Sequence, residues 1–386
     1  KEGGHMQKTI YLDNAATTFP KPAKVYEEMD YVNRNIAVNA GRGTYELSKQ
    51  AMKIIDACRT KMAHILSTDV HNIVFTSSIT EALNKVINGI NFEQGDNVYV
   101  SPYEHNAVLR TINRLMNIKN INIFELPLDE KLEIDIEKLE YMFLKYPPKC
   151  VCCTHISNVT GYILPISDIF GIAKRHGAIT ILDTAQSLGY LDVTELSKMC
   201  DFIAFAGHKS LYGPFGIGGF ANMNQYELSD YITGGTGSDS LNLNMPEELP
   251  VRYEPSSHNI TAIAGLNKAI ELLDMNENYR HERELTEYAI TQLTKVRDIH
   301  VIKYNNGKQL SVISFTTDIL KSDELGMILN EDYNIAVRTG YHCAAYIHKH
   351  LKDERHNGTV RIGLGMFNTK DEIDYLVKAI FEVLEG

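Results

Sequence analysis

Short apolar runs alternate with amphipathic segments from about residue 50 to residue 220. The runs are NIVFT, NVYVS, INIFEL, KCVCCTH, AITILD, DFIAFA and GIGGFA. Such short runs, rich in β-branched and aromatic residues and bounded by polar residues or glycine, are typical of buried strands. The segments between them have helical periodicity, and two helices are expected to begin near Thr80 and His105. This alternation predicts an α/β fold with a mainly parallel sheet covered on both faces, whose ligands gather at the carboxyl ends of the strands.

A smaller α+β domain is expected after about residue 260. The pattern there runs from a long helix starting at TAIAGLNKAIELLDM through SVISFTT, DELGMILNE, NIAVRTG and GTVRIGL to a final helix, DEIDYLVKAIFEVLEG. We expect residues 20–260 to form the large domain and residues 6–19 with 261–386 to form the small one. The segment KEGGH, residues 1–5, resembles a cloning remnant and is left out of both domains.

Composition narrows the classes of function. The chain has 386 residues, 44% of them hydrophobic and 23% charged, which predicts a globular protein of two or three domains. Its formal net charge of −11 argues against a nucleic-acid or anionic-membrane partner, because either would need a basic face. No apolar run reaches the roughly 18 residues that span a bilayer. With no export signal recognised, a cytoplasmic location is expected.

The six cysteines do not indicate a metal site. Their spacings match no paired zinc-ligand pattern, so no metal is expected. Three of them lie in KCVCCTH, where a cysteine usually serves as a small buried hydrophobe. Only Cys343, between RTGYH and AAY, lies in a loop-like context.

Polar residues that could take part in catalysis or ligand binding follow several of the predicted strands. Ser78 and Thr80 lie at a strand-to-helix turn, where free amides favour an anion such as phosphate, although an ordinary N-cap with Glu81 nearby is the more common reason for such a pattern. His105 follows the next strand, where a histidine is more often a capping or packing residue. Asn158 follows the cysteine-rich strand.

Asp183 and Lys209 follow two further strands. An aspartate after ITIL must be paired, hydrogen-bonded or helix-capping. A lysine just past a strand is usually solvated, but here several glycines surround Lys209, which indicates tight packing or close approach of another group. A phosphate cradle, a flat histidine, a buried carboxylate and a lysine at strand ends of one sheet together suit pyridoxal phosphate (PLP), which needs an amine, a carboxylate for its pyridine nitrogen and anion-binding amides.

The motifs in their order resemble the class V aminotransferase-type PLP enzymes, and within them the cysteine desulfurase and selenocysteine lyase family. The resemblance covers the chain from Met6 onward and rests on YLDNAATT, GRGTYELS, TEALN, EHNAV, THISNVTG, DTAQ, GHKSLYGP, RTGYHCA and VRIGLGMFN. RTGYHCA resembles the RxGHHCA loop of the second desulfurase group. The resemblance implies a PLP-dependent transferase of fold type I, with a large mainly parallel-sheet domain and a smaller α+β domain that carries the Cys343 loop.

The resemblance also implies how the cofactor is held. Lys209 would bind PLP covalently and move protons at the substrate Cα. Asp183 would pair with the pyridine nitrogen, Gln186 would bond the ring hydroxyl, and His105 would stack on the ring. The residues implied at the phosphate are Ile79, Thr80, His208 and, where the family has EAGT and this chain has EPSS, Ser257. Ala206 replaces a serine that often binds this phosphate.

The substrate side is implied in the same way. Asn158 and Arg361 would bind the substrate carboxylate, with Arg338 and Arg42 as further substrate-binding residues. Cys343 would attack the sulfur of bound L-cysteine, leaving a persulfide and L-alanine. Tyr341 replaces the usual histidine of the motif, and L-selenocysteine stays open as a second substrate.

Alternatives remain at this point. One is a class V aminotransferase or C–S lyase in which Cys343 is idle. A non-catalytic or nucleotide-binding protein using the GPFGIGGF and GGTGSDS glycines is weaker, because neither a Walker lysine nor a GxGxxG after a first strand is present. The resemblance further implies a homodimer, with GGTGSDS and EPSSHN near the shared sites, and a sulfur-acceptor protein as partner.

Overall fold

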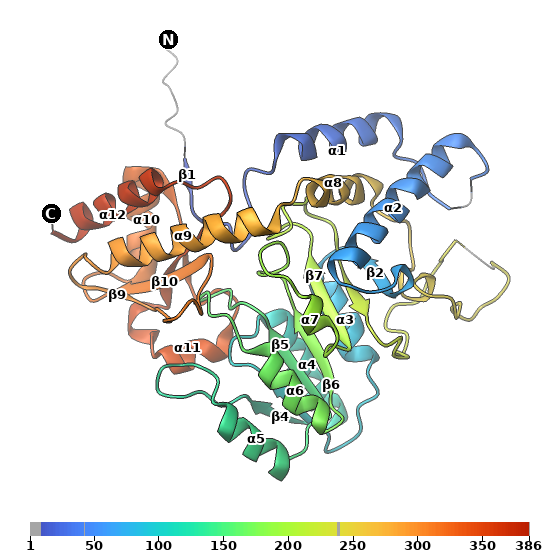
Figure 1. The fold of residues 1–386 in the computed structure, drawn as a ribbon, viewed down its shortest axis with the longest axis horizontal. Helices are drawn as coiled ribbons and strands as arrows, with labels where there is room; N and C mark the ends of the chain where they lie inside the picture. Colours follow the sequence, from blue (N-terminus) through green and yellow to red (C-terminus); the bar gives the residue numbers. More distant parts are fainter. Residues whose placement is uncertain (1–8, 42, 238–239, 386) are drawn as a thin grey trace. The chain divides into compact units, whose positions relative to one another are not determined.

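The structure is a computed structural model that describes residues 9–41, 43–237 and 240–385 (Figure 1). The expected cloning remnant and Arg42 lie outside the described residues. The chain divides into two compact units: a larger one of Lys21–His155 and Leu164–Met275, and a smaller one of Lys1–Pro20, Ile156–Ile163 and Asn276–Gly386. Relative to the expected division, residues 156–163 belong to the smaller unit and residues 261–275 to the larger one.

A mixed sheet forms the core of the larger unit. Among the described residues it has seven strands in the order β2-β8-β7-β6-β5-β3-β4, and β8 alone runs antiparallel to its neighbours. The strands are β2 (Ile73–Thr76), β3 (Asn97–Val100), β4 (Asn122–Glu125), β5 (Cys150–Thr154), β6 (Ile179–Asp183), β7 (Phe202–Ala206) and β8 (Gly218–Asn222). Every residue of the central strands β5, β6 and β7 is buried, and their sequences are accordingly mostly apolar. The predicted mainly parallel sheet is confirmed.

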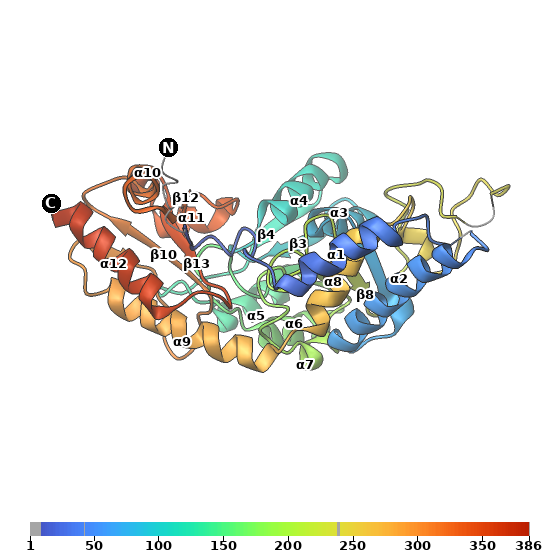
Figure 2. The ribbon, with the colours of Figure 1, turned by 90° about the horizontal axis from the view of Figure 1, so that it is seen from above.

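Helices cover both faces of this sheet. In Figure 2, α3 and α4 lie on one side of the strands, and α5, α6 and α7 lie on the other. Helices α1, α2 and α8 form a further group in which α8 packs against both of the others. The helices are α1 (Ala23–Asn35), α2 (Glu46–Ile65), α3 (Ile79–Gly89), α4 (Asn106–Lys119), α5 (Ile136–Lys145), α6 (Ile166–Arg175), α7 (Thr194–Ser197) and α8 (Ile260–Glu271), with short 3-10 turns η1 (Val70–Asn72) and η2 (Val251–Tyr253).

The smaller unit contains an antiparallel sheet in the order β12-β13-β10-β9. A separate parallel pair joins β1 to β11, so the N-terminal YLDNAATT segment packs in this unit as expected. The strands are β1 (Ile10–Tyr11), β9 (Ile299–Val301), β10 (Val312–Thr317), β11 (Ile335–Ala336), β12 (Arg338–Gly340) and β13 (Thr359–Gly363). The helices are α9 (Met275–Leu293), α10 (Ser322–Tyr333), α11 (Ala345–Leu351) and α12 (Lys370–Glu385), with the 3-10 turn η3 (Glu354–His356).

One apolar core holds the smaller unit together. Side chains from α9, α10 and α12 pack with those of β10 and β13, among them Leu285, Phe315, Leu325, Ile362 and Leu376. Burial of large aliphatic and aromatic side chains such as these is the main favourable contribution to folding. No helix in the described part of the chain is long and apolar enough to cross a membrane. Within the same residues, no group of three histidine, cysteine or acidic side chains is arranged to hold a metal ion.

Candidate active site

The segment around Lys209 is a tight turn between β7 and β8. Gly207 donates its amide to the carbonyl of Ile217 at 3.0 Å, and Gly213 donates to the carbonyl of Gly207 at 2.8 Å. A Cβ at Gly207 would lie 2.8 Å from that Ile217 oxygen, and a Cβ at Gly213 would lie 2.8 Å from the Gly207 oxygen. Both distances are too short for a side chain. These two glycines are therefore required by close contacts within the turn. Lys209 lies in this turn, shortly after the end of β7 at Ala206.

Asp183 lies at the end of the neighbouring strand β6 and is buried. Its carboxylate accepts a hydrogen bond from the amide of Ala185 at 2.8 Å. Burial raises the pKa of Asp183, while the Ala185 hydrogen bond and the charge of Lys209 act in the opposite direction. The ammonium of Lys209 therefore lies close enough to stabilise the carboxylate. The structure brings these two predicted residues together at adjacent strand ends.

Lys21 is a second ammonium near Lys209, and nothing in the sequence pattern indicated it. Its Nζ donates a hydrogen bond to the carbonyl oxygen of His208 at 2.7 Å, and burial lowers the pKa of Lys21 to about 7. Burial, followed by the charges of Lys209 and Lys21, lowers the pKa of His208 to about 3. The His208 ring is therefore neutral at physiological pH and stacks on Phe215 with ring centroids 4.6 Å apart. Lys209 and the partly protonated Lys21 beside a neutral histidine form a positively charged environment suited to an anion.

The start of α3 has the geometry of a conventional helix N-terminus. Ser78 is the N-cap, and its hydroxyl accepts a hydrogen bond from the amide of Glu81 at 3.2 Å. The Glu81 carboxylate returns to the amide of Ser77 at 2.9 Å. Ile79 is buried and Thr80 is exposed in the first turn. The N-cap interpretation thus accounts for Ser78 and Glu81, and a phosphate role for Ile79 and Thr80 stays a prediction.

His105 and Glu104 begin helix α4. His105 is the N-cap, and its Nδ1 accepts a hydrogen bond from the amide of Ala107 at 3.0 Å, which fixes the ring and leaves the proton on Nε2 in the neutral form. Glu104 is completely buried, and its Oε1 accepts from the Ser101 hydroxyl and from the Thr154 amide, each at 2.5 Å. No partner of its Oε2 is present among the described residues.

Burial of Glu104 favours its protonated form at neutral pH. Burial raises its pKa to about 8, the Ser101 hydrogen bond opposes this, and the charge of Asp183 raises it further. The neutral acid ties the loop carrying His105 to the end of β5. Sequence analysis missed Glu104, although a glutamate directly before a strand-end histidine was the available signal. Gln186 is buried in the turn that follows β6.

In the smaller unit, Arg361 of β13 lies at the centre of a buried network. Its Nη2 contacts the Asp13 carboxylate at 2.6 Å, and its Nη1 donates to the carbonyl of Asn158 at 2.9 Å. The Asn158 side-chain amide donates to the carbonyl of His342 at 2.8 Å. Arg338 is half-exposed, with its Nη1 3.9 Å from Asp13. Asp13, another residue that sequence analysis missed, therefore orients the arginines predicted at the substrate carboxylate.

Cys343 follows His342 in a tight turn between β12 and α11. All six cysteines lie in the described part of the chain, where five are buried and Cys343 is exposed. Burial lowers the pKa of Arg361; Asp13 opposes this, and Cys343 makes a smaller contribution in the same direction as Asp13. His342 is buried, and its Nε2 lies 2.9 Å from the Thr359 hydroxyl.

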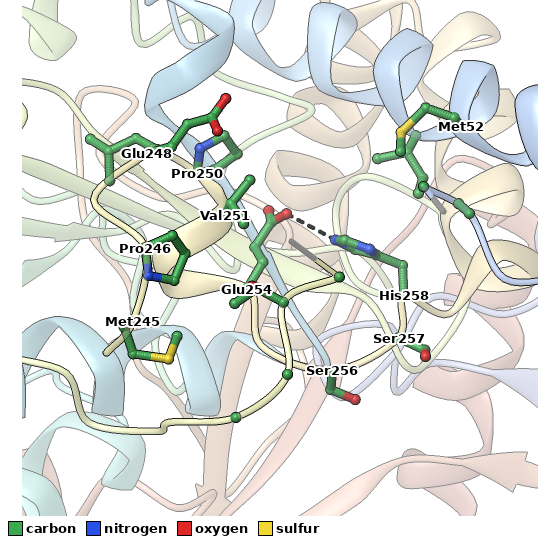
Figure 3. A pocket seen from close by; sticks show the side chains of 18 of the residues that line it. Met52, Met245, Pro246, Glu248, Pro250, Val251, Glu254, Ser256, Ser257 and His258 are labelled. Carbon is green, nitrogen blue, oxygen red and sulfur yellow. Dashed lines mark hydrogen bonds and ion pairs between the residues drawn. The ribbon is translucent and has the colours of Figure 1, made fainter. Parts of the chain in front are cut away.

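A pocket of about 1220 Å³ lies in the larger unit and is lined in part by residues 233–237, by Glu254 and by residues 256–258 (Figure 3). Glu254 anchors one wall: Arg59 Nη1 and Nη2 each donate to its carboxylate at 2.8 Å, and His258 Nε2 lies 2.9 Å from it. The Ser257 hydroxyl accepts from the Asn39 side-chain amide at 3.1 Å. The GGTGSDS and EPSSHN segments thus line one cavity in part, and a phosphate contact for Ser257 stays a prediction.

Comparisons with known proteins agree with this arrangement. The sequence model of the class-V aminotransferase family matches residues 10–376. A probable cysteine desulfurase of Halalkalibacterium halodurans is 32% identical over 97% of this chain and 93% of its own length. A cysteine desulfurase of Pectobacterium carotovorum is also 32% identical, over 97% of this chain and 93% of its own length.

Solved structures give the same result. The apo structure of cysteine desulfurase from Thermococcus onnurineus superposes with a TM-score of 0.91 at 30% identity, covering 98% of this chain and 95% of that one. The cysteine desulfurase CsdA of Escherichia coli, in its S-sulfonic acid form, gives a TM-score of 0.87 at 26% identity over 98% and 95% of the two chains. The fold expected from the sequence is therefore confirmed.

Proposed function

Because the chain belongs to the class-V aminotransferase family, and within it to the cysteine desulfurases, we propose that it converts L-cysteine to L-alanine with PLP and holds the released sulfur as a persulfide on Cys343. One observation carries the cofactor assignment: Lys209 and the buried Asp183 lie close together at the ends of adjacent strands. An amine beside a buried carboxylate is what PLP requires.

The residues present fit this cofactor. Asp183 is a buried carboxylate that would hold the proton of the pyridine nitrogen, and the hydrogen bond from Ala185 fixes its orientation. His105 has a ring fixed by its hydrogen bond to the Ala107 amide, as a stacking residue needs. Lys21 supplies positive charge beside His208, which suits a phosphate. Gln186, Ile79, Thr80 and Ser257 would complete the contacts to the ring hydroxyl and phosphate.

PLP held by these residues would supply an electron sink for the substrate Cα. Lys209 then takes and returns the proton at that carbon. Arg361 and Asn158 bind the substrate carboxylate, a task for which a planar guanidinium is well suited, and Arg338 adds charge nearby. We retain Arg42 as a further substrate-binding residue on the basis of the family resemblance.

Cys343 performs the sulfur transfer. Its thiolate forms an S–S bond with the substrate sulfur as the Cβ–S bond breaks, and the bonding pair stays with Cβ, which takes up a proton. L-Alanine leaves, and the protein holds one extra sulfur. The exposure of Cys343 and its position near the charge of Arg361 support this role.

The test is production of L-alanine and sulfide from L-cysteine by the wild type and by Cys343→Ala, with a reductant present. We expect the wild type to gain the mass of one sulfur on the peptide containing Cys343, and the variant to lose sulfide release. Unchanged sulfide release in Cys343→Ala would favour a C–S lyase or aminotransferase in which this cysteine is idle. Replacing L-cysteine with L-selenocysteine in the same assay decides whether both are substrates.

We also propose a cytoplasmic homodimer that passes sulfur to an acceptor protein. The pocket lined in part by residues 233–237, Glu254 and residues 256–258 supports an interface there, because these residues belong to the segments expected at the shared site. The absence of a disulfide among the six described cysteines supports a reducing compartment. Light scattering of the active protein tests the assembly, and a fully active monomer would contradict it.

A further inference from the structure

Two consecutive residues before α11 have an unusual backbone conformation. His342 has φ of 44° and Cys343 has φ of 56°, so both are left-handed. No other two consecutive non-glycine residues in the described ranges share this property. A left-handed conformation is unfavourable for a residue other than glycine and persists only where its surroundings hold it. The turn that carries the proposed nucleophile is therefore strained.

Three hydrogen bonds hold this turn. The Asn158 side-chain amide donates to the carbonyl of His342 at 2.8 Å, and His342 Nε2 lies 2.9 Å from the Thr359 hydroxyl. The Ala344 amide donates to the carbonyl of Tyr341 at 3.1 Å. Asn158, His342 and Thr359 are each more than nine-tenths buried. Buried hydrogen bonds of this kind are costly to break, because the separated groups cannot reach water.

The imidazole of His342 is weakly basic. Burial lowers the pKa of His342 to about 2, with Arg361, His348 and Arg338 adding to the effect, so its ring stays neutral. A group this weakly basic does not retain a thiol proton at neutral pH. The ring is nevertheless fixed by Thr359, which lies opposite Gly340 in the β12–β13 pairing. Its remaining role is to hold the backbone.

We propose that Asn158, His342 and Thr359 form a clamp that fixes the left-handed turn and thereby the direction in which Cys343 presents its sulfur. All three are positioning residues. The clamp continues into Arg361, which donates to the carbonyl of Asn158 at 2.9 Å and is itself held by Asp13. The residues proposed for the substrate carboxylate are thus connected by hydrogen bonds to the backbone of the nucleophile's turn. The catalytic meaning of the clamp rests on the proposed function, while its structural meaning does not.

Thr359→Val tests the clamp, because valine matches the shape of threonine and removes only the hydroxyl. In the holoenzyme we expect hydrogen–deuterium exchange of the peptide spanning residues 341–345 to become about 10-fold faster, corresponding to the loss of about one hydrogen bond. We expect kcat for L-alanine formation to fall about 10-fold with KM within about 2-fold, because substrate binding is retained and alignment of the sulfur is lost.

The matched control is Thr317→Val. Thr317 is a buried threonine in β10 of the same sheet, and its hydroxyl accepts from the Ile319 amide at 3.2 Å. This variant should leave exchange of residues 341–345 and kcat unchanged. If Thr359→Val does not fold, His342→Asn is measured in the same way. Asparagine tolerates the left-handed conformation but is too short to replace the imidazole contact with Thr359.

The clamp would be overturned if residues 341–345 of Thr359→Val exchanged hydrogen at the same rate as in the wild type, whatever the activity. The same holds for His342→Asn where it replaces Thr359→Val. A higher KM at unchanged kcat would also overturn it, because this pattern indicates a binding role. Failure of the proposed function is distinguished by the exchange experiment. If the protein makes no L-alanine from L-cysteine but hydrogen exchange of residues 341–345 is still faster in the variant, the clamp is supported and the proposed reaction is wrong.

Discussion

The ammonium of Lys21 donates a 2.7 Å hydrogen bond to the carbonyl oxygen of His208, the residue directly before Lys209. The two residues are separated by 187 positions in the sequence. Lys21 therefore fixes the backbone at the cofactor lysine and places a second positive charge beside it. Burial lowers the pKa of Lys21 to about 7, so this charge is partly lost near neutral pH.

Lys21→Met should change both stability and cofactor retention. The native pKa of about 7 is below the unfolded value of 10.5, so the unfolded chain binds more protons between these values and wild-type stability rises with pH in that window. Methionine has no ionisable proton. The free energy of unfolding of the variant should therefore lack this increase with pH, which amounts to up to about 1.4 kcal/mol per pH unit in the wild type. Urea unfolding at pH 7 and pH 9 measures the difference.

Loss of the Lys21 charge in Lys21→Met should also weaken PLP binding by about 10-fold. This corresponds to the contribution of about one charge-assisted hydrogen bond. Dialysis of the holoenzyme followed by absorbance measures PLP retention. Lys24→Met is the control, because Lys24 is exposed three residues further along the chain. Equal PLP retention and equal pH slopes in the wild type and Lys21→Met would show that Lys21 is not the buried cation described here.

Glu104→Gln should remove a second pH dependence of opposite sign. The pKa of Glu104 is raised to about 8 from 4.5, so the native state binds more protons between these values and wild-type stability falls as pH rises through that window. Glutamine keeps the acceptor for Ser101 and the Thr154 amide but cannot ionise. The variant should therefore gain stability relative to the wild type as pH rises from 5 to 8.

Unfolding midpoints in urea at pH 5, 6.5 and 8 provide the measurement for Glu104→Gln. Glu130→Gln serves as the control, because Glu130 is exposed. The difference in unfolding midpoint between the wild type and Glu104→Gln should change with pH. A difference that stays constant would mean that Glu104 is ionised throughout and that its burial is not as the structure describes.

The strands and the residues at their ends could be predicted from the sequence. Buried parallel strands such as β6 and β7 are mostly apolar, so the position of Asp183 as the last residue of β6 and of Lys209 shortly after β7 follow from local pattern alone. The expected long helix from Thr261 is instead two helices: α8 ends at Glu271, and α9 begins at Met275.

The contacts that tune the site could not be predicted in this way. Asp13 meets Arg361 across 348 positions, and Glu104 meets the Thr154 amide across 50. No local periodicity encodes such pairs. The ionisation state of Glu104 depends on complete burial, which only the folded structure fixes. Sequence patterns thus identify the groups that carry chemistry, while the fold determines their charge and orientation.

Cys343 should be the cysteine that iodoacetamide modifies in the native protein. It is exposed, whereas Cys58, Cys150, Cys152, Cys153 and Cys200 are buried. Burial raises the pKa of Cys58 to about 12 and also raises the pKa of Cys153, which suppresses their thiolates. Intact mass should therefore show one modification per chain, and Cys343→Ala should show none. Two or more rapid modifications in the wild type would contradict the burial of the other thiols.

Arg59→Met should destabilise the protein more than loss of an exposed arginine. Arg59 makes two hydrogen bonds of 2.8 Å to the buried carboxylate of Glu254, which also accepts from the Phe75 amide at 2.6 Å. Removing one partner of a buried ion pair leaves the other charge poorly solvated and costs about 3–5 kcal/mol. His258, 2.9 Å from the same carboxylate, compensates in part, so we expect a loss near the lower end of that range.

Arg34→Met is the matched control for Arg59→Met. Arg34 pairs with Asp30 at 2.8 Å on the exposed face of α1, and exposed pairs contribute less than about 1 kcal/mol. The free energy of unfolding in urea should therefore fall by several times more in Arg59→Met than in Arg34→Met. Since Glu254 anchors the wall that carries Ser257, PLP retention should also fall in Arg59→Met and remain at the wild-type level in Arg34→Met. Equal losses of stability in the two variants would contradict a buried, structurally required Arg59–Glu254 pair.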